Sequence, residues 1–424
     1  MSVRRPRLAP QWRSIEYFKS LGLLIEGRWR AKSFRESDFP RLAYEALVEF
    51  PAPGAASAAE PLSWVLSDAE ISRPLGPNQE FGQPPITVFQ SARFCIDVLY
   101  WRDGTTAIHS HPFSGAFQVL TGSSVHGVWR FEADDEISER MQLGHTSLTQ
   151  MELLAVGDTR PIAAGNAFIH SLFHLDHPSV TVVVRTNGEA RAAPPYQIHP
   201  PNLAMAAGLP DPRLQLRVQA LAALHDLDRL RFASAWRQAL SHLDFQSVFE
   251  ILRQFGGSDG IVDEESLGWA RRQHGARVDA LRPMFAEMKR QSYIFARRRQ
   301  LRTPEHRFFL ALLLNAPNRG EVLRMVAARV PEVPPLQTVL RWLRELAATP
   351  VAGEGGVSNA LGLTLDEEQL DVLGYVLEDL PFAQLIERLG DDYRPRDVAA
   401  AEPQLLRLNE AVRAAPLLQV LFRS

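Results

Sequence analysis

The sequence predicts an α+β multidomain protein in which an N-terminal β-barrel or jelly roll is followed by an all-α domain. Between residues 86 and 185, seven short runs are rich in β-branched and aromatic residues and are separated by Gly, Asp, Pro and Ser. After about Asn202 the spacing of apolar residues changes from two to 3.6. A length of 424 residues allows for more than one domain.

The N-terminal part of the chain divides into a helical segment and the barrel. Residues 1–50 are predicted as the helical segment, because 44–50 has the pattern of an amphipathic helix end and Pro51 and Pro53 stop it. The barrel domain is predicted over residues 60–200. Strands of this length and number are typical of an antiparallel barrel or a double-sheet jelly roll. The seven predicted strands are 86–89, 94–101, 116–120, 125–129, 151–156, 167–170 and 180–185.

The all-α domain is predicted over residues 203–424, where apolar residues recur at helical spacing. Helix start signals agree with this pattern. Thr303 precedes Pro304 as an N-cap precedes proline at the first helical position, and 364–367 fits a capping box. No catalytic constellation is evident beyond residue 202.

Composition limits the classes of function. A hydrophobic content of 46% and a charged content of 22% are those of a soluble globular protein. The net charge of −3 gives no reason to expect nucleic acid or a membrane as partner. Cys95 is the only cysteine, which excludes an intrachain disulfide and favours a cytoplasmic location. The basic residues 1–7 are not followed by the apolar stretch that a signal peptide needs, and the apolar run 21–25 is too short to span a bilayer.

Histidines give the strongest functional signal. Eight of the twelve lie between His109 and His199. Side chains alternate along a strand, so His109 and His111 point the same way, and the spacing of His170 and His174 has the same effect. Two such pairs predict a metal site, and imidazole nitrogen suits iron, zinc, copper and nickel.

The order of motifs around these histidines resembles the two cupin motifs, and more closely the thiol dioxygenase (cysteine dioxygenase-like) branch of that superfamily. The matching segments lie within about residues 94–186 and are Trp101–Gly104, His109–His111, Val119–Gly122 and Ile169–His170. The resemblance implies a mononuclear non-haem iron(II) centre held by His109, His111 and His170. It also implies a dioxygenase (an oxidoreductase) that oxidises a thiol or small carboxylate with dioxygen. Zn, Mn and Ni are the alternative metals.

The sequence departs from this branch at several positions. Gly115 and Ala116 stand where most cupins have a glutamate ligand. Ala116 and Asn187 stand where proteins of that branch often have a cysteine cross-linked to a tyrosine. Arg185 stands where they have a histidine near the metal. The resemblance therefore leaves the substrate more open than the metal.

Two roles beyond the ligands are predicted. Arg185 would clamp a substrate carboxylate if it faces the barrel interior, and otherwise it is a surface arginine at a strand end. His174 is either the third ligand in place of His170 or a group that acts on the ligands or the substrate. Four aspartates are candidates for orienting the imidazoles through their second nitrogens. The aspartates are Asp97, Asp103, Asp158 and Asp176. Separately, His126, on the predicted strand after Gly122, is expected to face inward, with no role assigned.

A second hypothesis belongs to a different class of function. A non-catalytic, metal-binding cupin would act as a ligand-binding or regulatory module, and its helical domain would engage a protein or peptide partner.

Overall fold

The computed structural model describes residues 13–52, 56–67, 82–102, 104–189, 194–206, 211–255, 263–353, 356–393 and 398–423. Asp103 lies outside these ranges. The chain divides into two compact units, Met1–Met288 and Lys289–Ser424, and the boundary falls within helix α8 (Leu281–Gln300). The boundaries at 1–50, 60–200 and 203–424 remain a prediction.

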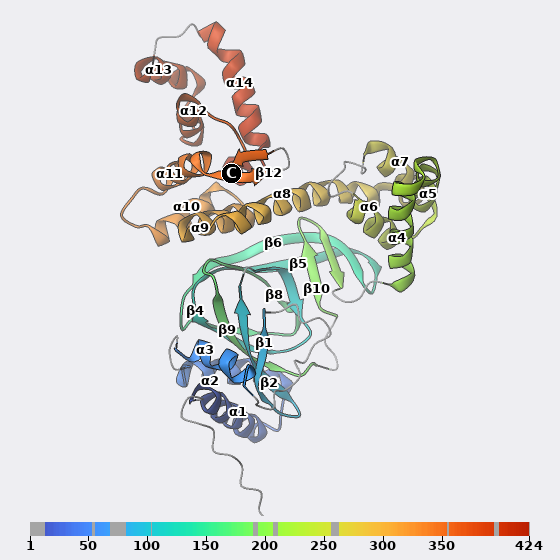
Figure 1. Cartoon of the computed structure of the whole chain (residues 1–424), viewed down its shortest axis with the longest axis vertical. Coiled ribbons are helices and arrows are strands. Elements are labelled where there is room, and N and C mark those ends of the chain that lie inside the picture. Colours follow the sequence, from blue (N-terminus) through green and yellow to red (C-terminus); the bar gives the residue numbers. More distant parts are fainter. Residues whose placement is uncertain are drawn as a thin grey trace, which may run out of the picture. The chain divides into compact units, whose positions relative to one another are not determined.

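Three N-terminal helices pack on one face of the strands (Figure 1). They are α1 (Arg13–Ala31), α2 (Phe39–Glu49), which follows the short η2 (Glu36–Asp38), and α3 (Ala56–Val65). Their apolar faces meet Val180, Val182 and Val184 in one buried cluster. Helix α2 ends just before Pro51, as the sequence predicts.

The strands form two antiparallel sheets. One is open, with strand order β1-β2-β9-β4-β7, and the other is a closed barrel with order β10-β11-β6-β5-β8-β3. Each of the seven runs predicted as strands lies in a strand, although 151–156 extends past the end of β6. The strands are β1 (Pro85–Gln90), β2 (Phe94–Trp101), β3 (Thr105–His111), β4 (Gly115–Thr121), β5 (Ser124–Ser138), β6 (Met141–Leu154), β7 (Thr159–Ile162), β8 (Gly165–His174), β9 (Ser179–Thr186), β10 (Tyr196–His199) and β11 (Leu203–Ala206).

The inner face of the open sheet packs against the barrel strands. Phe117, Val119 and Val183 of the open sheet share a buried cluster with Leu154 of β6 and Leu172 of β8. Because alternate residues point to opposite faces, His170 and His174 share the face of Leu172, whereas Ile169 belongs to a separate cluster with strands β3, β5, β10 and β11. The predicted histidines therefore lie in the layer between the two sheets.

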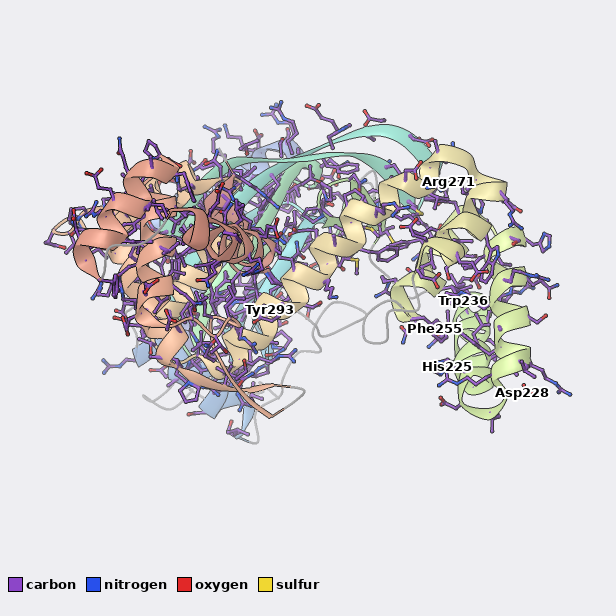
Figure 2. The ribbon with its side chains drawn as sticks, turned by 90° about the horizontal axis from the view of Figure 1, so that it is seen from above. His225, Asp228, Trp236, Phe255, Arg271 and Tyr293 are labelled. Carbon is purple, nitrogen blue, oxygen red and sulfur yellow. The ribbon has the colours of Figure 1, made fainter. Side chains whose placement is uncertain are left out.

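Helices α4–α7 complete the first unit beyond the strands. Trp236 is central to them: its ring lies 5.3 Å from that of Phe255, and its indole N–H donates to Ser266 (Figure 2). The same cluster contains Met141 and Leu203, so strands β6 and β11 share a core with these helices. The helices are α4 (Pro212–Leu227), α5 (Arg229–His242), α6 (Phe245–Phe255) and α7 (Glu264–His274), followed by η3 (Gly275–Ala280).

Where the structure describes it, the second unit is helical apart from one hairpin, β12 (Pro350–Gly353) and β13 (Gly356–Asn359). Thr303 is the N-cap of α9, as predicted. The predicted capping box at 364–367 is wrong by two residues, since Asp366 is the N-cap and bonds reciprocally with Gln369. The remaining elements are α9 (Pro304–Asn315), α10 (Arg319–Arg329), α11 (Pro335–Ala348), α12 (Glu367–Leu377), α13 (Phe382–Asp392), α14 (Val398–Ala414) and η4 (Gln419–Phe422).

The predicted fold class, a barrel followed by helices, is confirmed by this strand pairing and element order. Within the described residues, no helix combines the length and the apolar character required to cross a bilayer.

Candidate metal centre

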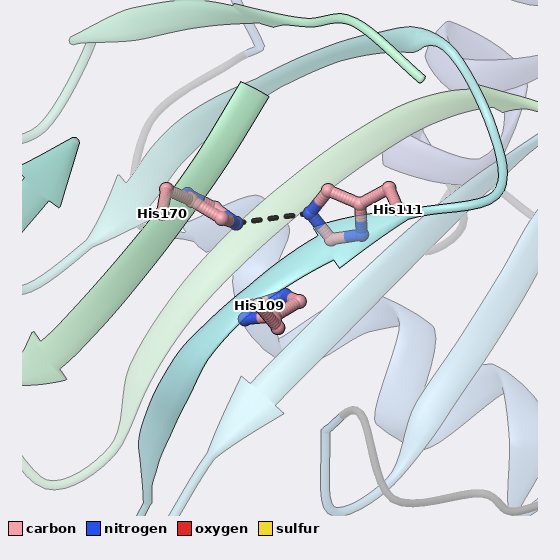
Figure 3. A group of neighbouring side chains, drawn as sticks. All are labelled: His109, His111 and His170. Carbon is pink, nitrogen blue, oxygen red and sulfur yellow. Dashed lines mark hydrogen bonds between the residues drawn. The ribbon is translucent and has the colours of Figure 1, made fainter. Parts of the chain in front are cut away.

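Three buried histidines converge between the sheets (Figure 3). His109 and His111 come from β3, and His170 comes from β8, where it is the direct cross-strand partner of His109. One ring nitrogen of each lies within 4.8 Å of the others. Among the described residues, this is the cluster of histidine, cysteine and carboxylate groups with the geometry to hold an ion, and it contains no carboxylate.

The spacing of two of these nitrogens fits a metal ion. The Nε2 atoms of His111 and His170 lie 2.9 Å apart. Histidine nitrogens bind zinc at about 2.0–2.1 Å, so two nitrogens bound to one ion would be about 3 Å apart at right angles and about 3.3 Å apart at the tetrahedral angle. A cation at this point would satisfy both lone pairs at once.

Hydrogen bonds orient two of the three rings. The carbonyl of Ala107 can only accept, so His109 donates its Nδ1–H to it over 2.7 Å and keeps the lone pair on Nε2. Nδ1 of His170 lies 3.2 Å from Nε2 of His126. A carboxylate or carbonyl in this position is the usual partner of a metal-bound histidine. In this protein the partner is another histidine.

A series of hydrogen-bonded charged side chains continues behind His126. Its Nδ1 donates to Glu152 over 2.9 Å, and Arg160 binds both oxygens of Glu152 over 2.9 and 2.5 Å. Burial raises the pKa of Glu152, but the hydrogen bonds from His126 and Arg160 outweigh it and lower the pKa to about 2. The carboxylate is therefore ionised and can only accept.

The three converging imidazoles are neutral at physiological pH. Burial lowers the pKa of His109 to about 4, and the backbone hydrogen bond only partly opposes this effect. Burial and neighbouring histidines hold the pKa of His111 and of His170 well below the ordinary value. Neutral imidazole is the form that binds metals, so this site does not need to lose protons before an ion enters.

His174 lies outside the cluster of three. Its ring stacks on Trp101 at 4.6 Å, and its Nδ1 lies 2.8 Å from the hydroxyl of Ser124. The structure thus brings His170, rather than His174, together with His109 and His111.

Arg185 lies in the layer between the sheets, as one of the two predicted alternatives requires. It follows Val183 on the inward face of β9 and donates to Asp97 over 2.7 Å. Its guanidinium lies 5.3 Å from the ring centre of Phe113, and the ring of Phe113 in turn lies 4.5 Å from that of His111. A positive charge therefore stands one aromatic ring away from His111.

The aspartates predicted to orient the imidazoles have other partners. Asp97 binds Arg185 and Thr87. Asp158 accepts from the amide of Ala155, and Asp176 accepts from Ser123, both at turns. These three aspartates are thus bonded to other groups, and the carboxylate that lies behind a ligand histidine, through His126, is Glu152.

Sequence reasoning did not single out Glu152. The available signal was a carboxylate within the apolar run 151–156, where an inward-facing charge requires a partner. His126 does face inward, as predicted, and is fully buried.

The departures from the thiol dioxygenase pattern have a structural basis. Gly115 is so close to β9 that a Cβ atom there would lie 1.9 Å from the carbonyl oxygen of Val184. Ala116 is buried in the outer cluster beneath α1–α3, whereas the next residue, Phe117, contacts His170. Neither position can supply a carboxylate ligand or a cross-linked cysteine in this backbone.

Comparisons with known proteins give limited likenesses. Comparison with protein-family models and with curated proteins found no match. Among solved structures, the DMSP lyase DddQ from Ruegeria pomeroyi DSS-3 is 20% identical over 26% of this chain and 45% of its own, with a TM-score of 0.18. A structure from the DMSP lyases RdDddP and RnDddQII is 14% identical over 44% of this chain and 99% of its own, with a TM-score of 0.24.

A third structure is described as an uncharacterized conserved protein with a double-stranded β-helix domain, from Klebsiella pneumoniae subsp. pneumoniae MGH 78578. It is 16% identical over 32% of this chain and 100% of its own, with a TM-score of 0.19. These values are too low to carry an argument about activity, and none of these three proteins is described as a thiol dioxygenase. The cupin-type architecture rests on the two packed sheets and the inward-facing histidines of this chain.

Proposed function

We propose that the protein is a mononuclear metal-dependent enzyme of cupin type, with His109, His111 and His170 as the ligands. One observation carries the proposal, namely three neutral imidazoles whose nitrogens lie within 4.8 Å of one another and have no carboxylate among them. A three-nitrogen face leaves coordination positions for substrate, and imidazole suits iron, zinc and nickel alike.

Within this proposal we favour iron(II) and oxygenase activity, on the likeness of the histidine motifs to the thiol dioxygenase branch. Bound here, iron(II) would supply the redox chemistry by which a thiol or small carboxylate reacts with dioxygen. The chain's own contribution is to hold the three imidazoles neutral and oriented in a layer walled by Phe113, Phe117 and Phe168, which keeps bulk water away from the ligands.

Arg185 and His174 are proposed to act on the substrate. The guanidinium next to Phe113 provides positive charge for a substrate carboxylate while it remains bonded to Asp97. His174, stacked on Trp101 near His170, is the proposed proton-carrying group. The single buried cysteine agrees with a reducing compartment, so we place the enzyme in the cytoplasm.

Metal analysis of the purified protein tests this function first. The wild-type protein should carry one equivalent of a divalent metal, and His109→Ala and His111→Ala should carry none. His145→Ala is the matched control, because that histidine is exposed and bonded to Asp134. Site variants that retain a full equivalent would refute the ligand set.

Oxygen consumption by the iron-loaded protein then tests the reaction. A panel of small thiols and small carboxylates should contain at least one compound that stimulates uptake by the wild-type protein but not by His111→Ala. Metal binding without oxygen uptake would favour the second candidate, a non-catalytic cupin that binds a ligand and engages a protein through its helices. The absence of a cross-linking cysteine at Ala116 is the observation that favours that candidate.

A further inference from the structure

A partly buried carboxylate on β6 is connected to a proposed metal ligand through a second histidine. His126 on β5 is the direct cross-strand partner of Glu152 on β6. On its other side His126 pairs with Leu172 of β8, which places His170 diagonally across on the same face. The register of three neighbouring strands thus sets up a continuous series from Glu152 through His126 to His170, and Arg160 of β7 joins it at Glu152.

The direction of the hydrogen bonds along this series follows from what each group can donate. Glu152 can only accept, so His126 donates from Nδ1. A neutral His126 then has its lone pair on Nε2 and accepts the Nδ1–H of His170. This leaves the lone pair of His170 on Nε2, the atom that faces His111.

We infer that His126 and Glu152 are positioning residues that fix the tautomer of His170 and strengthen it as a metal ligand, with Arg160 anchoring the carboxylate. The inference rests on the proposed metal site. A fully buried histidine beside an ionised carboxylate is costly unless its polar atoms are used, and here the series ends on a ligand nitrogen. Partners of this kind behind a ligand typically change metal affinity by about 10–100-fold.

Four substitutions in the full-length protein test the inference. His126→Phe fills the space but removes the acceptor, whereas His126→Gln keeps an acceptor oxygen. Glu152→Gln removes the charge with little change of shape. Glu132→Gln is the matched control, because Glu132 lies on β5 with an exposed side chain.

Zinc affinity, measured by competition with a chelator, should fall about 10–100-fold in His126→Phe and Glu152→Gln. It should fall less in His126→Gln and remain unchanged in Glu132→Gln. In the zinc-free protein, nitrogen NMR of the histidines should show His170 protonated at Nδ1 in the wild-type protein and in His126→Gln, but not in His126→Phe.

Zinc affinity equal to wild type in both His126→Phe and Glu152→Gln, with the His170 tautomer unchanged, would overturn the inference. A wild-type protein that binds no metal would instead refute the proposed function. The NMR measurement would then still show whether His126 sets the tautomer of His170, because it requires no metal.

Discussion

His111 and His170 come from strands 59 residues apart in sequence, yet their Nε2 atoms lie 2.9 Å from each other. His174, four residues after His170 on the same face of β8, instead bonds Ser124 and stacks on Trp101. The choice of the third ligand therefore depends on strand register.

Replacing each of these two histidines should separate their roles. His170→Ala should lower metal affinity by at least about a hundredfold, since even a group behind a ligand can be worth that much. His174→Ala should keep a full equivalent of metal, because the other three histidines remain in place. Metal content of the two purified variants is the measurement, and loss of metal only from His174→Ala would reverse the assignment.

The face on which the histidines lie was predictable, but their pairing was not. The His-x-His spacing places His109 and His111 on one side of any strand, and the spacing of His170 and His174 does the same. The alternation of side chains along a strand cannot distinguish His170 from His174, because both positions satisfy it. The decision came from the pairing of His109 with His170, which depends on contacts distant in sequence.

The long hairpin of β5 and β6 shows a second limit of prediction. The sequence indicated β5 only as far as residue 129, but the strand continues to Ser138. Its second half, residues 131–138, is mostly polar and exposed, so it lacks the alternation that marks a half-buried strand. Tertiary contacts help to hold it, including the bidentate ion pair of Asp135 with Arg277.

The stability of the metal-free protein should fall as pH decreases from 6.5 toward 4.5. His109 takes up a proton near pH 6.5 when unfolded but only near pH 4 when folded, so acid favours the unfolded chain throughout this interval. Each such histidine contributes about 1.4 kcal/mol per pH unit. Urea unfolding in the presence of a chelator, at several pH values, measures the slope.

Between pH 6.5 and 4.5, the change in the free energy of unfolding comes from the histidines and not from Glu152. That carboxylate has its pKa lowered to about 2, so its own stabilising contribution is lost only as pH falls below its ordinary value of 4.5. His109→Asn should reduce the slope of the unfolding free energy against pH, between pH 6.5 and 4.5, by the contribution of one histidine. A flat stability profile in the wild-type protein would contradict the neutral state of these histidines.

Gly115 should tolerate no side chain. A Cβ atom at this position would lie 1.9 Å from the carbonyl oxygen of Val184, so Gly115→Ala must separate β4 from β9. We expect a loss of about 3 kcal/mol or more in the free energy of unfolding. Gly268→Ala is the control, because that glycine lies in α7 with no atom near its added Cβ, and alanine there should stabilise by up to about 1 kcal/mol.

Thermal and urea unfolding of the two glycine variants measure this difference. A Gly115→Ala protein as stable as wild type would show that the β4–β9 pairing is looser than described. It would also reopen this position to a side chain that reaches the site.

The ion pair of Arg185 with Asp97 should be costly to break from one side. Nε of Arg185 lies 2.7 Å from Oδ2 of Asp97, and the Asp97 side chain is only 6% exposed. Asp97→Ala should therefore destabilise the protein by about 3–5 kcal/mol, because it leaves a buried guanidinium without its carboxylate. Replacing both residues, as Asp97→Leu with Arg185→Met, should cost much less than the single change. The exposed pair of Arg130 and Glu132 is the control, worth at most about 1 kcal/mol.

Unfolding free energies of the single and double variants give the coupling between the two charges, and steady-state kinetics separate that structural role from a role in binding. If Arg185 also holds a substrate carboxylate, the double variant should fold and retain metal but show a raised KM for carboxylate substrates with little change for uncharged thiols. An unchanged KM for every substrate in a stable double variant would assign the guanidinium to the barrel core alone. Retention of metal is the internal check, because Arg185 bonds Asp97 and is not one of the three proposed ligands.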